Sequence, residues 1–134
     1  MNLYLDSSAA VKLFTAEAES PALALVVREL IGSGVGRLFL SRLTQLETVR
    51  SLRRKREDPT IAAPFFEAAD LVDIKPQDFE KAQNMLPSSL RSLDALHLVS
   101  ALRLSELGIA MVTYDRQLAD AAGLAGLRVI SPGL

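Results

Sequence analysis

The stretch NLYLDSSAAVKLF, residues 2–14, decides the fold. Its first four residues, 2–5, predict a short β-strand, and the next three, Asp6, Ser7 and Ser8, are typical of a helix N-terminus. Residues 9–14 continue that helix. A short strand that runs directly into a helix is the repeating unit of a parallel α/β sheet.

The same alternation of short apolar runs and longer helical patterns continues through the chain. Ser20 and Pro21 begin a second helix, with Ser20 as the predicted cap and Gly32 near its end. Four more strands are predicted, at residues 38–40, 71–74, 110–113 and 129–130. Further helices are predicted at residues 42–56, 60–69, 76–85, 93–107 and 115–122. The sequence therefore predicts an α/β domain with a central, mainly parallel, five-stranded sheet.

Length and composition limit the class of protein. The 134 residues suit one domain, residues 1–134, and 49% of them are hydrophobic, which is enough for a sizeable core. The longest apolar runs fall far short of the roughly 20 residues that span a bilayer. The first residues show neither a basic segment nor a long apolar one, so we expect no secretory signal and a cytoplasmic location.

The residue types that are rare here exclude several chemistries. The chain has no Cys, which removes disulfides, thiolate catalysis and Cys-ligated zinc, and its single His excludes a multi-His metal site. The net charge is −1, so the field of the whole protein does not attract nucleic acid. Binding of a polyanion would require a local basic patch or a bound metal.

Four acidic residues stand out by their positions. Asp6 and Asp115 follow predicted strands, and ligands of parallel sheets bind outside the carboxyl ends of the strands. Asp94 lies in the first turn of its predicted helix. Glu47 lies early in the helix after the second strand and can project toward the same edge. We therefore expect Asp6 and Asp115 to lie in one shared cleft.

Helix capping offers a competing explanation for these acids. Asp is a favoured cap, and acids in a first turn complement the helix dipole. Caps account for each acid separately, however, and do not predict that four acids converge. Clustered carboxylates repel one another unless a cation neutralises them, and hard oxygen ligands favour Mg²⁺ or Mn²⁺ over zinc.

Four segments that carry these acids resemble the motifs of the PIN-domain ribonucleases, and most closely those of the VapC-like toxins of type II toxin–antitoxin systems. LYLDSSAAVKLF resembles the opening motif with Asp6, and Leu46-Glu47 is similar to the acidic helix position. SLDALHLVSAL resembles the motif with Asp94. The segment MVTYDRQLADAAGLAGLRVISPG resembles the last motif, with Thr113 and Asp115 at its key positions.

The resemblance implies a three-layer α/β/α domain whose first and fourth strands are adjacent at the centre of a doubly wound sheet. It assigns Asp6, Glu47, Asp94 and Asp115 to one catalytic, Mg²⁺- or Mn²⁺-binding site. It also implies metal-dependent endonucleolytic cleavage of RNA, often tRNA or rRNA. The implied partners are a small antitoxin that blocks the cleft and, commonly, a second copy of the chain.

Several further residues are candidates for supporting roles. The hydroxyls of Ser7 and Thr113 could orient an acid or a metal-bound water, although Ser7 could also cap a helix and Thr113 could be an ordinary strand residue. Arg50 and Arg54 share a helix face with Glu47 and could contact RNA phosphates, within a basic cluster that Arg53, Lys55 and Arg56 extend. A solvated face, or an ion pair of Glu47 with Arg50, is the alternative.

Two other polar residues, His97 and Lys12, lie close in sequence to the acids. His97 lies three residues after Asp94, and a general base is possible there, but a packed structural His is the more common case. Lys12 is expected at the surface.

Two other functions compete with the ribonuclease hypothesis. A phosphoacceptor signalling domain also uses a doubly wound sheet, Mg²⁺ and an acidic pocket. It needs an Asp at the end of the third strand and a Lys after the last one, whereas Asp73 is predicted inside its strand and no Lys follows residues 129–130. A non-catalytic module with the same fold is disfavoured because all four acids are present.

Overall fold

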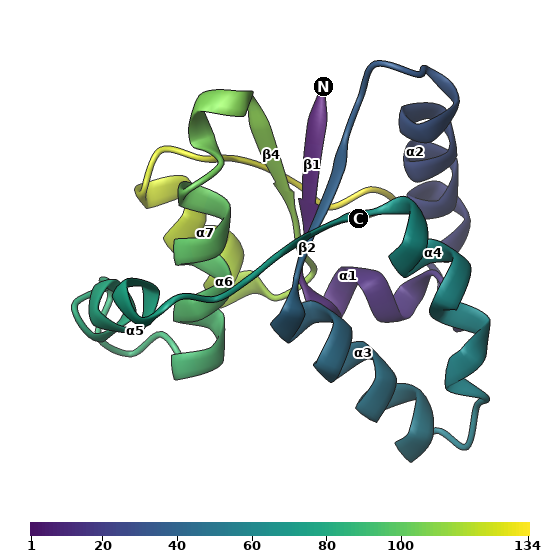
Figure 1. The fold of residues 1–134 in the computed structure, drawn as a ribbon, viewed down its shortest axis with the longest axis horizontal. Helices are drawn as coiled ribbons and strands as arrows, with labels where there is room; N and C mark the ends of the chain where they lie inside the picture. Colours follow the sequence, from purple (N-terminus) through teal and green to yellow (C-terminus); the bar gives the residue numbers. More distant parts are fainter.

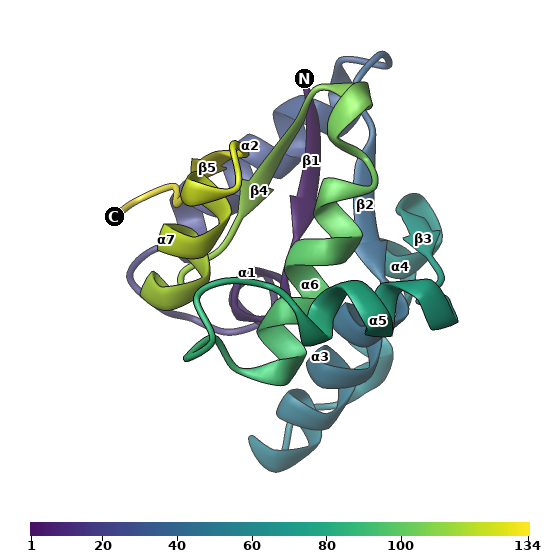
Figure 2. The same ribbon diagram turned by 90° about the vertical axis from the view of Figure 1, so that its left-hand side faces the viewer.

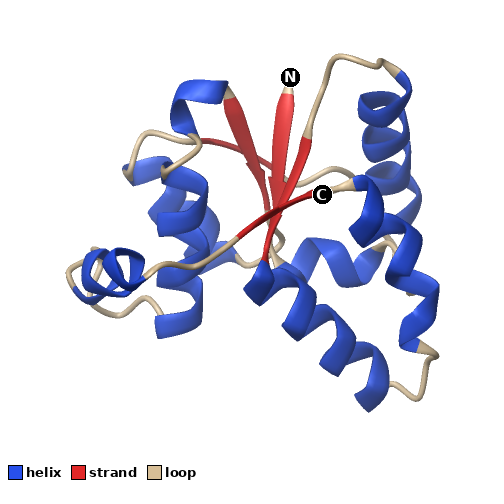
Figure 3. Ribbon diagram, in the orientation of Figure 1, coloured by secondary structure: helices blue, strands red, loops and turns tan.

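The computed structural model describes all residues, 1–134, as an α/β sandwich around one five-stranded sheet. All strand pairs are parallel, and the strand order is β3-β2-β1-β4-β5 (Figures 1 and 3). The predicted fold class is confirmed, as is the adjacency of the first and fourth strands. The strands are β1 (Asn2–Leu5), β2 (Leu38–Ser41), β3 (Asp70–Val72), β4 (Ile109–Val112) and β5 (Arg128–Ile130).

Helices cover both faces of the sheet. The helices α1 to α4 lie on one side of it, and α5 to α7 lie on the other (Figures 1 and 2). Every helix is too short or too polar to cross a membrane. The helices are α1 (Ser7–Lys12), α2 (Ser20–Gly32), α3 (Arg42–Arg54), α4 (Ala63–Ala68), α5 (Pro76–Gln83), α6 (Ser92–Leu102) and α7 (Arg116–Leu124), with 3₁₀ turns η1 (Pro59–Ala62) and η2 (Ser105–Leu107).

The central strands are apolar on both faces, which explains why they are buried on both. Leu3 and Leu5 of β1 point into the hydrophobic cluster under α2, α3 and α4, whereas Tyr4 between them points into the cluster under α6 and α7. Alternate residues of a strand face opposite sides, so one strand serves two cores. This arrangement fixes the register of β1 and hence the position of Asp6, the residue that follows it.

The helix predicted at residues 60–69 is wrong as a single element. The segment forms the turn η1 and then the short helix α4, which has Pro64 in its first turn. Proline lacks an N–H, and its ring clashes with the carbonyl four residues earlier, so one continuous helix is not possible here.

Three smaller expectations are also wrong. Ser20 is the first residue of α2 and not its cap, because its hydroxyl donates to the Thr15 carbonyl and accepts from the Glu17 N–H instead. The helix that starts near Asp94 ends at Leu102, before η2, although Gly108 closes this region in the left-handed conformation with φ of 68°. Asp73 lies after β3 rather than inside it.

Candidate active site

Asp6 lies at the carboxyl end of β1 and is almost fully buried, with 2% of its surface exposed. One carboxylate oxygen, Oδ1, accepts hydrogen bonds from the Ala9 N–H at 3.0 Å and from the Ser8 hydroxyl at 2.7 Å. The other, Oδ2, accepts the Thr113 hydroxyl at 2.6 Å. Burial raises the pKa of Asp6, although these hydrogen bonds and the nearby His97 lower it. The ionised form of Asp6 is therefore less favourable here than in water.

Asp115 lies just beyond β4 and is tied to Asp6 through one side chain. The Asp115 N–H donates to the Thr113 hydroxyl oxygen at 3.1 Å, and that hydroxyl donates to Asp6. The Asp115 carboxylate accepts the Leu118 N–H at 3.0 Å and so caps α7, as Asp6 caps α1. Asp6 and Asp115 are therefore both helix caps and members of one acidic group. Helix capping and an acidic cleft, the two explanations that the sequence offered, are both correct for these residues.

Glu47 and Asp94 reach the same space from two helices. Glu47, in the second turn of α3, accepts a hydrogen bond from Nε2 of His97 at 2.7 Å. Asp94, in the first turn of α6, is half-buried. Burial raises the pKa of Asp94, and the charges of Asp115, Asp6 and Glu47 raise it further, although His97 opposes them. The effect of the other three carboxylates on Asp94 indicates that all four share one electrostatic environment.

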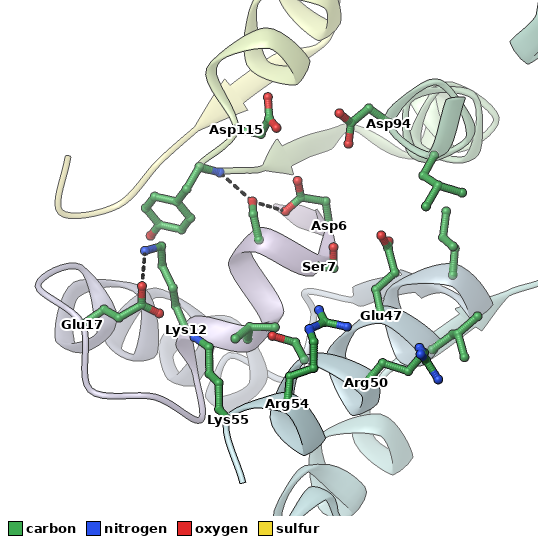
Figure 4. Close-up of a pocket in the computed structure, with 17 residues that line it drawn as sticks. Asp6, Ser7, Lys12, Glu17, Glu47, Arg50, Arg54, Lys55, Asp94 and Asp115 are labelled. Atoms are coloured by element: carbon green, nitrogen blue, oxygen red, sulfur yellow. Dashed lines mark hydrogen bonds and ion pairs between the residues drawn. The ribbon is translucent and has the colours of Figure 1, made fainter. Parts of the chain in front are cut away.

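The four acids line one open cavity of about 770 Å³ (Figure 4). Asp94 and Asp115 lie on one side of it, and the basic side chains of Arg50, Arg54 and Lys55 lie on the other, on and just after α3. Lys12 also lines the cavity and is largely buried. The expectation that Lys12 is a surface residue is wrong, because ion pairs with Glu17 and Glu19 hold it against the Tyr114 ring.

Of the two predicted hydroxyl residues, Thr113 hydrogen-bonds to Asp6 and Ser7 does not. Ser7 lines the cavity but makes no side-chain hydrogen bond, whereas the neighbouring Ser8 donates to Asp6 and accepts the Tyr114 N–H at 2.9 Å. Sequence reasoning missed Ser8 because the two serines are adjacent at a helix start. Only the path of the backbone decides which of them turns back toward Asp6.

The ion pair of Glu47 with Arg50 that the helix spacing allowed does not form. Glu47 pairs with His97 instead, and Arg50 has no acidic partner. Its guanidinium is exposed at the cavity wall.

The donor set fits a hard divalent cation in its chemistry. The cavity offers carboxylates without thiols, and burial and mutual repulsion disfavour ionised Asp94, a cost that a bound cation would offset. As the side chains lie, no three acidic or His groups are already close enough to hold one ion. Asp6, Glu47, Asp94 and Asp115 are the residues that would hold such a cation.

The raised pKa of Asp94 predicts that Asp94→Asn stabilises the metal-free protein at neutral pH. A carboxyl with a higher pKa in the folded state ionises more readily in the unfolded state, so its ionisation favours unfolding as the pH rises. Thermal unfolding in EDTA should give a midpoint a few degrees higher for the variant at pH 7. The difference should vanish below the ordinary pKa of 3.8, where Asp94 is neutral in both states. A less stable variant at pH 7 would contradict this.

Comparison with known proteins places the chain in a family. The model of the PIN domain matches residues 3–124. Ribonuclease VapC46 of Mycobacterium tuberculosis is 39% identical over 132 residues, which cover 97% of each chain. The chain therefore belongs to the PIN-domain family and, within it, to the VapC ribonucleases.

Two solved structures share the fold at low sequence identity. VapC20 of Mycobacterium tuberculosis, described as a toxin that cleaves the sarcin–ricin loop, has a TM-score of 0.71 at 17% identity and covers 97% of this chain and 99% of its own. VapBC-1 from nontypeable Haemophilus influenzae has a TM-score of 0.61 at 14% identity and covers 98% of both chains. These likenesses extend over the whole α/β sandwich.

Proposed function

We propose that the protein is a metal-dependent endoribonuclease that hydrolyses RNA phosphodiester bonds and acts as the toxin of a toxin–antitoxin pair. One observation carries the proposal: acids from four different places in the chain line a cavity whose opposite wall is basic. Acids alone would repel a phosphodiester, and bases alone would bind it without chemistry. The two together suit a cation and an RNA backbone side by side.

In this proposal Asp6, Glu47, Asp94 and Asp115 would hold Mg²⁺ or Mn²⁺. Bound there, the cation would activate water and offset the charge that develops on the phosphoryl oxygens. The Thr113 hydroxyl orients both Asp6, to which it donates, and Asp115, from whose backbone N–H it accepts. Ser7, at the cavity surface, is placed to contact a water or the substrate rather than an acid.

The basic wall supplies the proposed phosphate contacts. Arg50 and Arg54 are exposed and lie one turn apart on α3, beside Glu47, so they can track successive phosphates of a single strand. Guanidinium groups bind phosphate oxygens in pairs, which gives orientation as well as attraction.

Replacing Arg54 should weaken RNA binding in a salt-dependent way. In Arg54→Ala, the slope of log K against log salt should become shallower by about 0.7–1, the value for one lost phosphate contact. Fluorescence anisotropy with an RNA oligonucleotide in EDTA would measure this. Arg53→Ala is the matched control, because Arg53 is exposed on the same helix but does not line the cavity. Equal effects of both variants would count against a specific contact.

The proposed partners are an RNA, a cognate antitoxin and a second copy of the chain. VapC20 is a toxin that acts on the sarcin–ricin loop, which supports a structured RNA such as rRNA or tRNA as substrate. The similarity of the fold to the solved structure of VapBC-1 supports an antitoxin partner. Leu46 and Leu93 are about half exposed beside the acids, and they form an apolar surface that such a partner could contact. We place the protein in the cytoplasm, where these partners occur.

Mapping of RNA ends in cells tests this function. Brief expression of the intact protein should produce a small set of new RNA ends in tRNA or rRNA, and expression of Asp6→Asn should not. Co-expression of the product of an adjacent small reading frame should suppress the ends. Identical sets of ends from the intact protein and from Asp6→Asn would overturn the proposal.

The competing phosphoacceptor function has no support in the site. Asp73 lies outside the acidic cavity, is 71% exposed in its side chain and pairs with Arg42 at 3.0 Å. A phosphoacceptor Asp would need to lie among the metal-binding acids, so no acid in the predicted position serves that role.

A further inference from the structure

His97 is the least explained polar residue of the molecule. It lies on α6, one turn after Asp94, and only 1% of it is exposed. Both of its ring nitrogens are used: Nδ1 lies 2.8 Å from the Tyr4 hydroxyl, and Nε2 lies 2.7 Å from Oε1 of Glu47. The imidazole therefore joins β1, α6 and α3 behind the acidic cavity.

The geometry of this link determines where the Glu47 carboxylate lies. The Tyr4 ring meets the His97 ring edge-on, with centroids 6.1 Å apart and planes at 68°, and the hydroxyl holds Nδ1. With the ring fixed in this way, Nε2 can point only toward Glu47. The Glu47 side chain has several rotatable bonds and no other hydrogen-bond partner, so the contact with His97 alone selects its orientation.

Tyr4 owes its own position to the packing of the sheet. It is fully buried in the cluster under α6 and α7, between the two leucines of β1 that face the other way. The anchor for His97 is thus a rigid central strand, whereas Glu47 is 28% exposed in its side chain at the cavity. The buried Tyr4 therefore fixes the ring of His97, and His97 in turn fixes the carboxylate of Glu47.

We propose that His97 is a positioning residue, which Tyr4 anchors and which holds Oε1 of Glu47 so that the second carboxylate oxygen is left for the cation of the acidic site. The proposal rests on the proposed function in that a divalent cation is expected there. Partners that hydrogen-bond a metal ligand typically change metal affinity about 10–100-fold when they are removed. A His that serves only to pack α6 against the sheet would change stability and leave metal affinity unaltered.

Two substitutions at position 97 separate these roles. His97→Asn places an amide near the position of Nδ1, so it can still reach Tyr4 but not Glu47. His97→Gln places an amide N–H near the position of Nε2 and can still donate to Glu47. Mn²⁺ titration of the purified full chain without RNA, followed by electron paramagnetic resonance, reads affinity independently of cleavage, and thermal unfolding in EDTA reads stability.

We expect His97→Asn to weaken Mn²⁺ binding about 10-fold or more and His97→Gln to recover part of the loss. Tyr4→Phe removes only the anchoring hydroxyl and should give a smaller loss, which keeps the test available if His97→Asn unfolds. With RNA present, the substitutions should lower kcat more than they raise KM. Unchanged Mn²⁺ affinity in both His97→Asn and Tyr4→Phe would overturn the proposal.

A double-mutant cycle shows whether His97 acts through Glu47. In the Glu47→Ala background, His97→Asn should cause no further loss of Mn²⁺ affinity, because the carboxylate it would orient is gone. A loss of the same size in both backgrounds would overturn the proposal, as would the absence of Mn²⁺ binding by the intact chain. Mn²⁺ binding with the expected cycle but without RNA cleavage would instead reject the proposed function and leave the positioning role standing.

Discussion

Asp6→Asn should abolish RNA cleavage by the purified protein while the fold remains intact. Asp6 is the most buried of the four acids and is held by three donors, so its carboxylate is the fixed point of the site. In the proposed site, loss of its charge would remove a ligand of the cation, whose electrostatic contribution is several kcal/mol. Each 1.4 kcal/mol changes the rate about tenfold, so we expect a loss of about 1000-fold or more.

The structure explains why this substitution should be tolerated. The Asn carbonyl can accept the Ala9 N–H and the Ser8 hydroxyl, so the cap of α1 survives. Its amide can donate to the Thr113 hydroxyl, which accepts instead of donating. Asp94→Asn should have an equally large effect on cleavage, and Asp73→Asn, outside the cavity, should have none.

The measurement is cleavage of an RNA oligonucleotide with Mg²⁺ or Mn²⁺, alongside circular dichroism of each variant. EDTA should stop cleavage by the intact protein, and excess Mn²⁺ should restore it. Full cleavage by metal-loaded Asp6→Asn would remove the mechanism. Lost cleavage together with lost secondary structure would show instead that Asp6 is needed as a cap.

Arg103→Met should destabilise the protein by about 3–5 kcal/mol, the usual cost of removing one partner of a buried ion pair. Asp78 of α5 has no exposed surface, and its Oδ2 accepts Nη1 of Arg103 at 2.7 Å and the Lys75 N–H at 2.8 Å. Its Oδ1 has no partner. Without Arg103 the buried carboxylate would lose its only counter-charge, and α5 would lose its polar attachment to the end of α6.

Urea unfolding would measure this effect, which is large beside a total stability of about 5–15 kcal/mol. Arg37→Met is the matched control, because Arg37 also pairs with an Asp, at 3.0 Å, but both side chains are about half exposed. The control should cost less than about 1 kcal/mol. Adding Asp78→Asn to Arg103→Met should recover part of the loss. Equal effects of Arg103→Met and Arg37→Met would contradict the role of burial.

Local signals in the sequence predict the scaffold well, because they depend on neighbours along the chain. The apolar runs located all five strands, and the rule for strand ends brought Asp6 and Asp115 to one edge. The single helix expected over residues 60–69 is wrong because Pro64 lies in the first turn of α4 and does not allow one continuous helix. Asp94 was predicted both from its place in the first turn of a helix and from the resemblance, whereas Glu47 rested mainly on the resemblance, because its local sequence is that of an ordinary helix.

Side-chain contacts between segments that are distant in the sequence could not be predicted from local sequence patterns. The spacing of Glu47 and Arg50 suggested a pair within one helix, yet Glu47 bonds to His97, 50 positions away. Likewise, Thr113 was a candidate without a known target until the register of β1 and β4 placed its hydroxyl on Asp6. These pairings depend on how the helices pack, which periodicity does not encode.

The bond between Thr113 and Asp6 joins residues 107 positions apart, across the central pair of strands. Ribosomes add about 5–20 residues per second, so several seconds separate the synthesis of these two residues. Until β4 emerges, β1 has no neighbour on that side, and the nascent chain also lacks Asp115, which follows β4. The site is thus incomplete until translation has passed Asp115, and the messenger RNA and ribosome that produce the chain are not exposed to an assembled site before that point.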